Sequence, residues 1–318
     1  MLSSLNFVKG AVAKAGFIPA LTHFRISRST VRGFNGQMAL SSPIATDLDC
    51  SPNAKQFVRA LNACKETVAL HLKGGKLVVQ SGPFKCNVDC SDPLAFPDIV
   101  PAGRFVNITP EFYEALTILE PFISEDENRP WSCGILLEAQ SAFATNNIVA
   151  VECWHGLGLP LRVNLPSASV RELLRVGEPP HRLQIEAHRI SFHWPDGRWL
   201  ATQLLTAEWP DVGAVLEKAQ GTQEAVPEGF WLALEQLLPL CDKGDACWLL
   251  GDQIATGPEP DVEGAAVQVE CALQGAYNAR QLAKLRELAQ MVGWDAYPNA
   301  VPFFGEKCRG VILGRRTT

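Results

Sequence analysis

The stretch ALHLKGGKLVV at residues 69–79 aligns without a gap with RLQIEAHRISF at residues 182–192. In both stretches apolar and polar residues alternate on either side of a turn, which is typical of two half-buried antiparallel strands. Leu70 aligns with Leu183 in this superposition. The chain therefore contains an internal repeat, and the repeat predicts a β-hairpin in each copy.

The similarity extends beyond the hairpin in both directions. Upstream, NAKQFVRALNA (53–63) aligns with PSASVRELLRV (166–176), and both have the apolar spacing of a short amphipathic helix. Downstream, each copy ends in an aromatic residue followed by Pro and Asp, at residues 96–98 and 209–211. A third copy of the helix is weaker, NARQLAKLRELAQMVG at residues 278–293. A helix, a strand pair and the same ending recur in register, which chance explains poorly.

Three further segments have helical periodicity, at residues 5–17, 109–123 and 226–240. Strand-like sequence follows the helices, as in residues 134–154. Within residues 24–40, Asn35-Gly36 lies between two strand-like runs and predicts a hairpin turn. Six helices, each followed by β structure, therefore alternate along the chain.

This order predicts an α+β fold of three tandem domains, each made of two similar halves. We expect the domains at residues 1–103, 104–219 and 220–318. A chain of 318 residues is long enough for each domain to bury its own core.

Composition narrows the class of protein. The apolar fraction is 47% and the charged fraction is 19%, as in globular proteins, and no apolar run is long enough to span a membrane. Ten cysteines without a regular framework predict reduced thiols and a cytoplasmic location. Residues 1–46 contain no acid, as in a transit peptide, but the hairpin within residues 24–40 favours a folded domain.

Basic residues recur on the second helix of each repeat and on the first helix of the chain. They are Lys9, Lys14, Lys55, Arg59, Lys65, Arg171, Arg175, Arg280, Lys284 and Arg286. Solvated helix faces are one interpretation, because most surface cations are only that. Aligned cations at repeated positions also suit a regular polyanion, since phosphate attraction requires charge and not a specific sequence. A net charge of −6 leaves room for one basic face.

Catalytic and cofactor motifs are scarce. The sequence has no GxxxxGK[ST] loop, and HGLGLP at residues 155–160 lacks the third glycine of a dinucleotide fingerprint. Cys153 and His155 are the best candidates for a metal ligand or nucleophile, but no second ligand pair has zinc-like spacing. We therefore predict no enzyme activity, no catalytic residue, no cofactor and no metal.

Taken in order, the motifs resemble those of the bacterial sliding clamp, the beta subunit of the replicative DNA polymerase. The first domain contributes IPALTHFRISR, KQFVRALNACKETVALHLKGGKLVVQSG and AFPDI. The second contributes CGILLE, ATNNIVAVE, VNLPSASVRELLRV and EWPDVGAVL, and the third AYNARQLAKL and GVILGRR. The resemblance covers essentially the whole chain.

The resemblance implies a DNA polymerase processivity factor. Two chains of this family pair head to tail into a homodimeric ring of six domains, with helices inside and sheets outside. The implied partners are double-stranded DNA, bound without sequence preference, a DNA polymerase and a clamp loader. Divergence from the family pattern favours a phage-encoded or outlying member.

The resemblance also implies two further sites. The loop SEDENRPWSCG (124–134) matches a DNA-contacting segment of the family and contains Arg129 and Trp131. Trp131 either stacks on a base or is a half-buried strand residue. A hydrophobic groove for partner peptides is expected at Thr145, Asn147, Ile148, Val149, Val311, Ile312, Leu313 and Arg315. The family usually has Asp-Gly-His-Arg-Leu where residues 146–150 stand, so the peptide preference is open.

Two alternatives remain beside the clamp. One is a clamp-fold interaction scaffold that does not encircle DNA, which the acidic residues Glu111, Glu114, Glu120, Glu228 and Glu235 on the first helices favour. The other is an enzyme centred on Cys153 and His155.

Overall fold

The protein is described from a computed structural model that covers residues 1–16, 18–241 and 245–316, without the side chains of residues 19 and 270–272. The chain forms two compact units. Unit 1 comprises Met1–Pro110 and Ala168–Leu204, and unit 2 comprises Glu111–Ser167 and Leu205–Thr318. The predicted α+β class is confirmed. No helix in the described residues has the length and apolar character needed to cross a membrane.

Unit 1 contains two antiparallel sheets. Its helices are α1 (Leu2–Val8), α2 (Pro19–Thr22), α3 (Ala54–Ala63) and α5 (Ser167–Val176), with 3₁₀ turns at Lys9–Ala11 and Pro93–Ala95. Its strands are β1 (Arg25–Ser27), β2 (Thr30–Phe34), β3 (Met38–Pro43), β4 (Ser51–Pro52), β5 (Ala69–Lys73), β6 (Lys76–Ser81), β7 (Phe84–Ser91), β8 (Arg104–Asn107), β13 (Arg182–Ile185), β14 (Arg189–His193) and β15 (Trp199–Gln203). The sheet orders are β1-β2-β3-β15-β14-β13-β8 and β4-β7-β6-β5.

Unit 2 also contains two sheets. Its helices are α4 (Pro110–Leu119), α6 (Val212–Lys218), α7 (Phe230–Leu237) and α8 (Ala279–Ala283), with 3₁₀ turns at Glu120–Phe122, Pro130–Ser132, Leu238–Leu240 and Trp294–Ala296. Its strands are β9 (Gly134–Leu137), β10 (Ser141–Thr145), β11 (Val149–Trp154), β12 (Val163–Pro166), β16 (Glu224–Ala225), β17 (Ala246–Ala255), β18 (Ala266–Asn278), β19 (Met291–Val292), β20 (Ala300–Phe304) and β21 (Cys308–Leu313). The sheet orders are β12-β9-β10-β11-β21-β20-β19-β16 and β17-β18.

The repeated hairpins are confirmed with the same register in both copies. In β5–β6, Leu72 lies opposite Leu77, and in β13–β14, Ile185 lies opposite Ile190. The first hairpin turns at Gly74-Gly75, where φ is 57° and 75°. These positive values explain the two glycines, because residues with a side chain rarely adopt them.

In the middle of the chain, one strand from each half pairs with the sheet of the other half. The strand before α4, β8, pairs with β13 of the following half, whereas β12, before α5, pairs with β9 of the preceding half. Each half also continues into a neighbouring segment, through β15–β3 and β11–β21. The division between the two compact units therefore falls inside residues 104–219 rather than at their ends.

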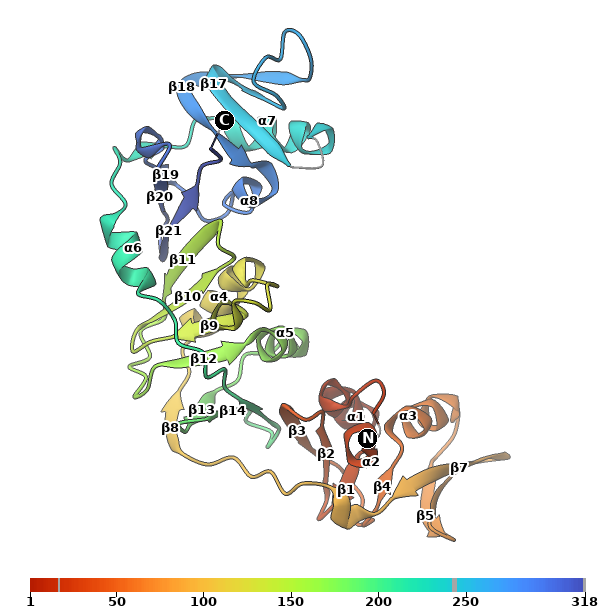
Figure 1. Ribbon diagram of the computed structural model, residues 1–318. Helices are drawn as coiled ribbons and strands as arrows, with labels where there is room; N and C mark the ends of the chain where they lie inside the picture. Colours follow the sequence, from red (N-terminus) through yellow and green to blue (C-terminus); the bar gives the residue numbers. More distant parts are fainter. Residues whose placement is uncertain (17, 242–244, 317–318) are drawn as a thin grey trace. The chain divides into compact units, whose positions relative to one another are not determined.

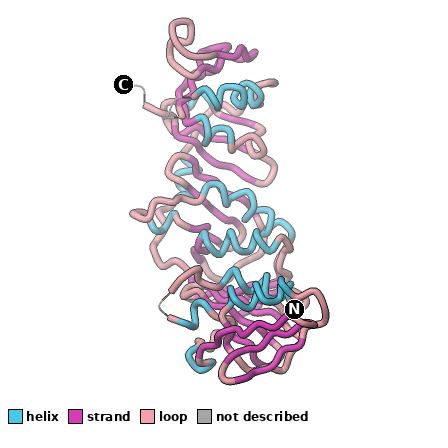
Figure 2. The backbone as a smooth tube through the Cα atoms, turned by 90° about the vertical axis from the view of Figure 1, so that its right-hand side faces the viewer, coloured by secondary structure: helices cyan, strands magenta, loops and turns pink. Residues whose placement is uncertain are grey.

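In unit 2 the helices lie on both faces of the eight-stranded sheet. Figure 1 shows α4 and α8 on one face of β10, β11 and β21, and α6 on the other. Figure 2, viewed from the side of α4 and α8, shows helices in front of the strands. Helix α6 therefore covers the face of the sheet that α4 and α8 do not cover.

Two predicted helices are shorter than their periodicity indicated. The helix expected at 5–17 ends as α1 at Val8 and continues only as a 3₁₀ turn. The helix expected at 278–293 ends as α8 at Ala283. Tighter turns follow, because Leu285 N donates to Leu282 O and Leu288 N to Leu285 O. Leu282, Leu285 and Leu288 remain buried. The apolar spacing therefore predicted their burial correctly, but it did not predict the helix length.

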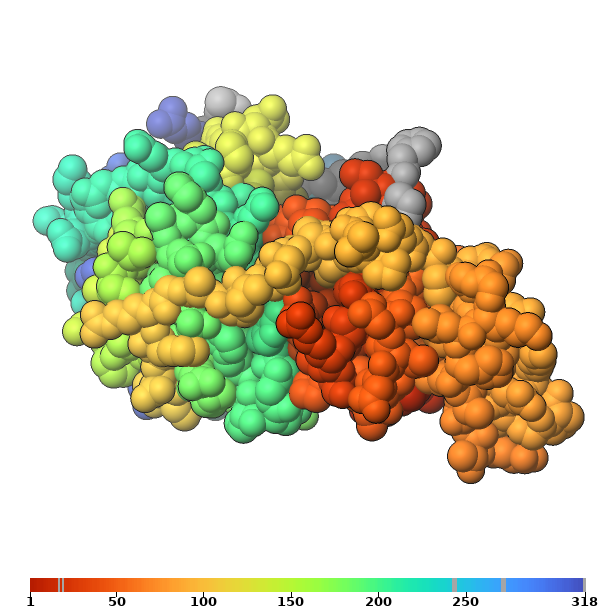
Figure 3. All heavy atoms as spheres, turned by 90° about the horizontal axis from the view of Figure 1, so that it is seen from below, coloured from red at the N-terminus to blue at the C-terminus, as the bar shows by residue number. Residues whose placement is uncertain are grey.

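The connection between β7 and β8 is an extended segment on the surface of unit 1 (Figure 3). Arg32 of β2 pairs with Asp98 in this segment, at 3.1 Å. Asp98 belongs to the aromatic-Pro-Asp ending of the first repeat, so this ion pair attaches the ending to β2.

Candidate functional site

The cations of α3 are exposed and unneutralised. Asn53 caps the helix by accepting a hydrogen bond from Gln56 N at 3.0 Å, and Phe57 is fully buried. Lys55 and Arg59, four residues apart, lie on the solvent side of the helix. Neither makes an ion pair or hydrogen bond within the part of the chain that the structure describes. Their charge is therefore available to a ligand.

The other predicted cations of the first domain resemble them. Lys9, in the turn after α1, Lys14, and Lys65, just beyond α3, are all exposed. No ion pair joins any of them to an acid among the described residues. Unit 1 thus presents five unneutralised cations from this region.

Arg175 on α5 has a structural role. Its guanidinium makes a two-pronged ion pair with Glu172, at 2.8 and 2.5 Å, and donates to Phe7 O at 3.0 Å. The Glu172 side chain is only 8% exposed, so Arg175 compensates a nearly buried carboxylate and ties α5 to α1. Arg171 is exposed on the same helix.

The cations near α8 are also engaged. Arg280 pairs with Asp245 at 2.7 Å, and Arg286 pairs with Glu235 of α7. Lys284 donates to Pro121 O at 2.7 Å, and burial lowers its pKa below the ordinary lysine value. The sequence pattern did not distinguish these cations from those of α3, because their partners come from distant segments.

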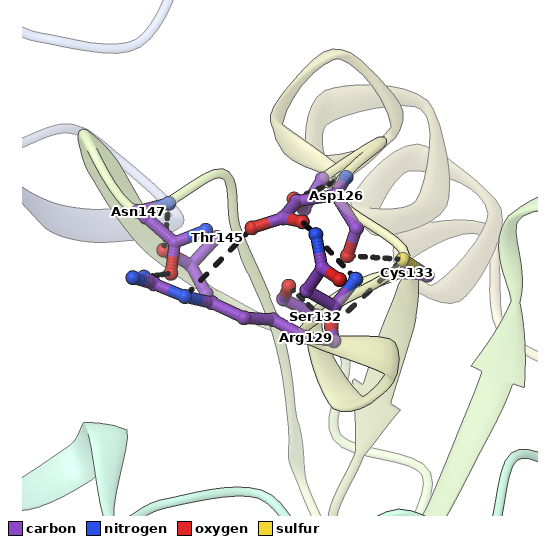
Figure 4. Close-up of polar contacts among 8 residues, drawn as sticks. Asp126, Arg129, Ser132, Cys133, Thr145 and Asn147 are labelled. Atoms are coloured by element: carbon purple, nitrogen blue, oxygen red, sulfur yellow. Dashed lines mark hydrogen bonds and ion pairs between the residues drawn. The ribbon is translucent and has the colours of Figure 1, made fainter.

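Arg129 links the loop at 124–134 to the turn between β10 and β11. Its guanidinium donates to Asn147 Oδ1 at 2.7 Å and lies 3.8 Å from the Asp126 carboxylate (Figure 4). Ser132 and Cys133 donate back to carbonyl oxygens of the same loop. The loop is therefore internally bonded, and Arg129 is part of that network.

Trp131 packs as a half-buried residue. Its ring meets Trp209 edge to face, with centroids 5.1 Å apart, and its carbonyl accepts a hydrogen bond from Asn164 at 2.8 Å. Of the two interpretations drawn from the sequence, the structure favours packing over a side chain free to stack on a base.

The turn between β10 and β11 holds the first predicted groove residues. The Thr145 hydroxyl is buried, donates to Val149 O at 2.8 Å and accepts from Asn147 N at 3.1 Å. Asn147 has a φ of 69°, a conformation that Asn tolerates better than most residues. Thr145 therefore shapes the turn rather than offering a free hydroxyl.

The remaining groove residues divide between the two faces of the β11–β21 pair. Val311 packs in a cluster with α6, on the face of the sheet that α6 covers, which is called the outer face. Its neighbour Ile312 and the opposite residue Val149 point to the inner face and are 0% and 1% exposed. Both residues therefore lie in the core. Ile148 and Leu313 are accessible at the strand ends, joined by a 2.8 Å backbone hydrogen bond.

Sequence reasoning missed the contribution of α6. Asp211 of the Trp-Pro-Asp motif caps this helix, accepting from Ala214 N at 3.0 Å. The outer-face cluster under it contains Leu136, Phe143, Trp209, Val212, Leu216 and Val311. Val215 on α6 and Leu313 on β21 remain 49% and 45% exposed. The available signal was Asp211 followed by apolar residues at helical spacing, Val212, Val215 and Leu216, which predicts a capped amphipathic helix.

Arg315, the last predicted groove residue, is exposed but held through its backbone. Its N–H donates to Ala276 O at 2.7 Å, and its carbonyl accepts from the Tyr297 hydroxyl at 2.9 Å. It therefore lies beside β18 rather than beside α6.

The residues of the alternative site, Cys153 and His155, lie in the interior of unit 2. Both side chains are buried, and burial lowers the pKa of His155 below the ordinary value. Within the described ranges, no three His, Cys, Asp or Glu side chains gather as a metal ion requires.

Comparisons with known proteins identify the fold. No family model matches the sequence, and no curated protein matches it. Among solved structures, the DNA polymerase sliding clamp of Bacillus subtilis matches with a TM-score of 0.85 and 17% identity, over 100% of this chain and 97% of that chain. The DNA polymerase III subunit beta of Pseudomonas aeruginosa matches with a TM-score of 0.85 and 16% identity, over 99% and 97%.

A third match is the beta clamp of Helicobacter pylori in a structure with a DNA ligase peptide, with a TM-score of 0.82, 14% identity, and 99% and 97% coverage. The three matches extend over practically the full length of both chains. The protein therefore has the fold of a DNA sliding clamp, as the sequence resemblance implied.

Proposed function

We propose that this protein is a DNA sliding clamp, a processivity factor that encircles duplex DNA and tethers a DNA polymerase. The observation that carries the proposal is the full-length fold match, with a TM-score of 0.85 to a bacterial clamp. The five unneutralised cations near α1 and α3 support it, because sliding requires phosphate attraction without base readout. The function includes no catalytic step and requires no cofactor.

The ring is proposed to form from two chains, each with domains at residues 1–103, 104–219 and 220–318. The sheets that continue across the proposed boundaries, at β3–β15 and β11–β21, support this arrangement. A third continuation, between two chains, would close the ring by symmetry. Double-stranded DNA, a DNA polymerase and a clamp loader are the other proposed partners, in the cytoplasm.

The topological test uses nicked circular plasmid and the full chain. After unbound protein is removed by gel filtration, we expect a complex that persists on the circle and dissociates when a restriction enzyme linearises the DNA. Light scattering should give about 69 kDa, twice the 34.7 kDa of one chain. Equal retention on circular and linear DNA would contradict encirclement.

A scaffold with the clamp fold that does not encircle DNA is the second candidate. The engagement of Arg280, Lys284 and Arg286 favours it, because these cations contribute less charge to a lining than the sequence implied. In the plasmid experiment this scaffold would show no loss on linearisation, so one measurement separates the two functions.

For partner binding, we propose the outer face of unit 2 beside α6. Val215, Ile148 and Leu313 are accessible apolar residues of α6 and of the β11–β21 pair. We expect Leu313→Asp to weaken binding of a polymerase-derived peptide by roughly tenfold to a hundredfold, because it places a charge among apolar anchors. Calorimetry measures this, and unchanged plasmid retention is the control. An unaffected peptide affinity would place the groove elsewhere.

A further inference from the structure

Two cysteines from distant parts of the sequence face each other in unit 2. Cys153 of β11 lies directly opposite Cys308 of β21 in the antiparallel register. The adjacent pair, Trp154 and Lys307, is hydrogen-bonded, with Trp154 N donating to Lys307 O at 3.0 Å. Because hydrogen-bonded and non-hydrogen-bonded pairs alternate, Cys153 and Cys308 form a non-hydrogen-bonded pair.

That position brings the two side chains together. Side chains of directly opposite residues lie on one face of the sheet, and Cα atoms of non-hydrogen-bonded pairs are about 4.5 Å apart. Disulfides span Cα separations of about 4.4–6.8 Å, so this pair falls at the short end of the usable range. A bond there is attainable.

The neighbouring strands leave space for the sulfur atoms to turn. On β10 the residue opposite Cys153 is Ala142, and beyond Cys308 the opposite residue is Gly305, whose N–H donates to Cys308 O at 2.8 Å. A Cβ at position 305 would lie 3.1 Å from the Cys308 sulfur. Small residues on both sides therefore let the sulfurs rotate to the disulfide geometry.

The two thiols differ in reactivity. A hydrogen bond from Cys153 lowers the pKa of Cys308, and the same contact together with burial raises the pKa of Cys153. Cys308 is partly exposed, whereas Cys153 is 1% exposed. Cys308 is thus the thiol that meets a reagent, and Cys153 the one that resolves the product.

We propose that Cys153 and Cys308 are a reversible oxidation site that forms a cross-strand disulfide, with a low-molecular-weight disulfide such as glutathione disulfide as the oxidant. The Cys308 thiolate attacks one sulfur of the oxidant and releases one glutathione thiolate. Cys153 then loses its proton and attacks the Cys308 sulfur, which releases the second glutathione. Two protein thiols are oxidised and one glutathione disulfide is reduced to two thiols.

The bond would join β11 to β21 covalently. These strands are distant in sequence, so the crosslink closes a long loop and restricts the unfolded chain. We expect oxidation to raise the midpoint of the thermal transition of unit 2 by about 5 °C or more.

The test is a redox titration of the full chain with defined ratios of reduced and oxidised glutathione, followed by alkylation of remaining thiols and peptide mapping. The expected product is one crosslinked peptide pair containing Cys153 and Cys308, which dithiothreitol reverses. In Cys153→Ser a glutathione adduct should accumulate on Cys308, and in Cys308→Ser neither product should form.

Cys133→Ser is the matched control, because Cys133 is also a partly exposed thiol of unit 2 but has no cysteine opposite it; the crosslink should persist. The proposal is overturned if Cys153 and Cys308 both remain alkylatable while other thiols are oxidised. It is equally overturned if the wild-type chain stops at a glutathione adduct on Cys308. Neither result depends on whether the protein encircles DNA.

Discussion

Helices α3 and α8 occupy equivalent places in the repeat and carry similar numbers of cations, yet their electrostatic environments are opposite. Lys55 and Arg59 on α3 are exposed and unneutralised within the described residues. Arg280 on α8 and Arg286 beyond it are held by Asp245 and Glu235. The difference shows that a charge pattern in the sequence reports where cations are, but not whether they are available to DNA.

The largest expected effect is on α3. Lys55→Glu with Arg59→Glu should reduce DNA affinity on the order of 100-fold, because two phosphate contacts become repulsions. The slope of log affinity against log salt should fall by about 2, which a titration from low to physiological salt measures. The exposed positions make a folding defect unexpected, and circular dichroism checks this. An unchanged salt slope would remove α3 from the DNA-binding surface.

A gain of affinity should follow when the cations of α8 are released. Asp245→Asn with Glu235→Gln leaves Arg280 and Arg286 without acidic partners and removes two negative charges. We expect DNA affinity to rise up to about tenfold. Asn suits position 245, where φ is 49°.

Fluorescence anisotropy with a duplex measures that gain. The matched control is Glu208→Gln with Glu217→Gln, two neutralisations at exposed positions at and just before α6, which should leave the affinity nearly unchanged. Equal gains in both variants would mean that net charge, and not the released arginines, is responsible.

The sequence predicted much of the fold because the feature that repeats is the alternation of buried and exposed residues. The alternation around Gly74-Gly75 fixed a hairpin and its register, and the same pattern gave β13–β14. It did not predict that β8 and β12 exchange between halves, since strand partners depend on contacts that no local pattern encodes.

The candidate site was less predictable, for the same physical reason. Periodicity does not distinguish Arg175 from Arg59. In the structure, however, the Arg175 guanidinium is bonded to Glu172 and to Phe7 O. Val149 and Val311 both read as groove residues, although alternation along a strand places them on opposite faces. Only the positions of the partners decide which residue is accessible.

A variant of Arg175 tests whether the cation of α5 is available to DNA, like those of α3, or is engaged within the protein, like those of α8. Arg175→Gln should cost about 1–3 kcal/mol of unfolding free energy, because it leaves the nearly buried Glu172 without its counterion. DNA affinity should change less than threefold once the folded fraction is corrected for. Urea denaturation measures the first quantity, and Glu172→Gln with Arg175→Gln should recover part of the loss. A normal stability with weak DNA binding would place Arg175 with the α3 cations.

The smallest effect is expected where the sequence pattern alone would predict a large one. Arg280→Gln with Arg286→Gln removes two cations of the repeat, but their charges are already neutralised by Asp245 and Glu235. DNA affinity should fall less than about threefold, and the folded state should lose little stability. The comparison with the α3 variant is made at the same salt concentration, since screening affects both. A loss as large as that of the α3 variant would mean that DNA displaces the two carboxylates, and that the ion pairs at α8 are a resting state rather than a permanent neutralisation.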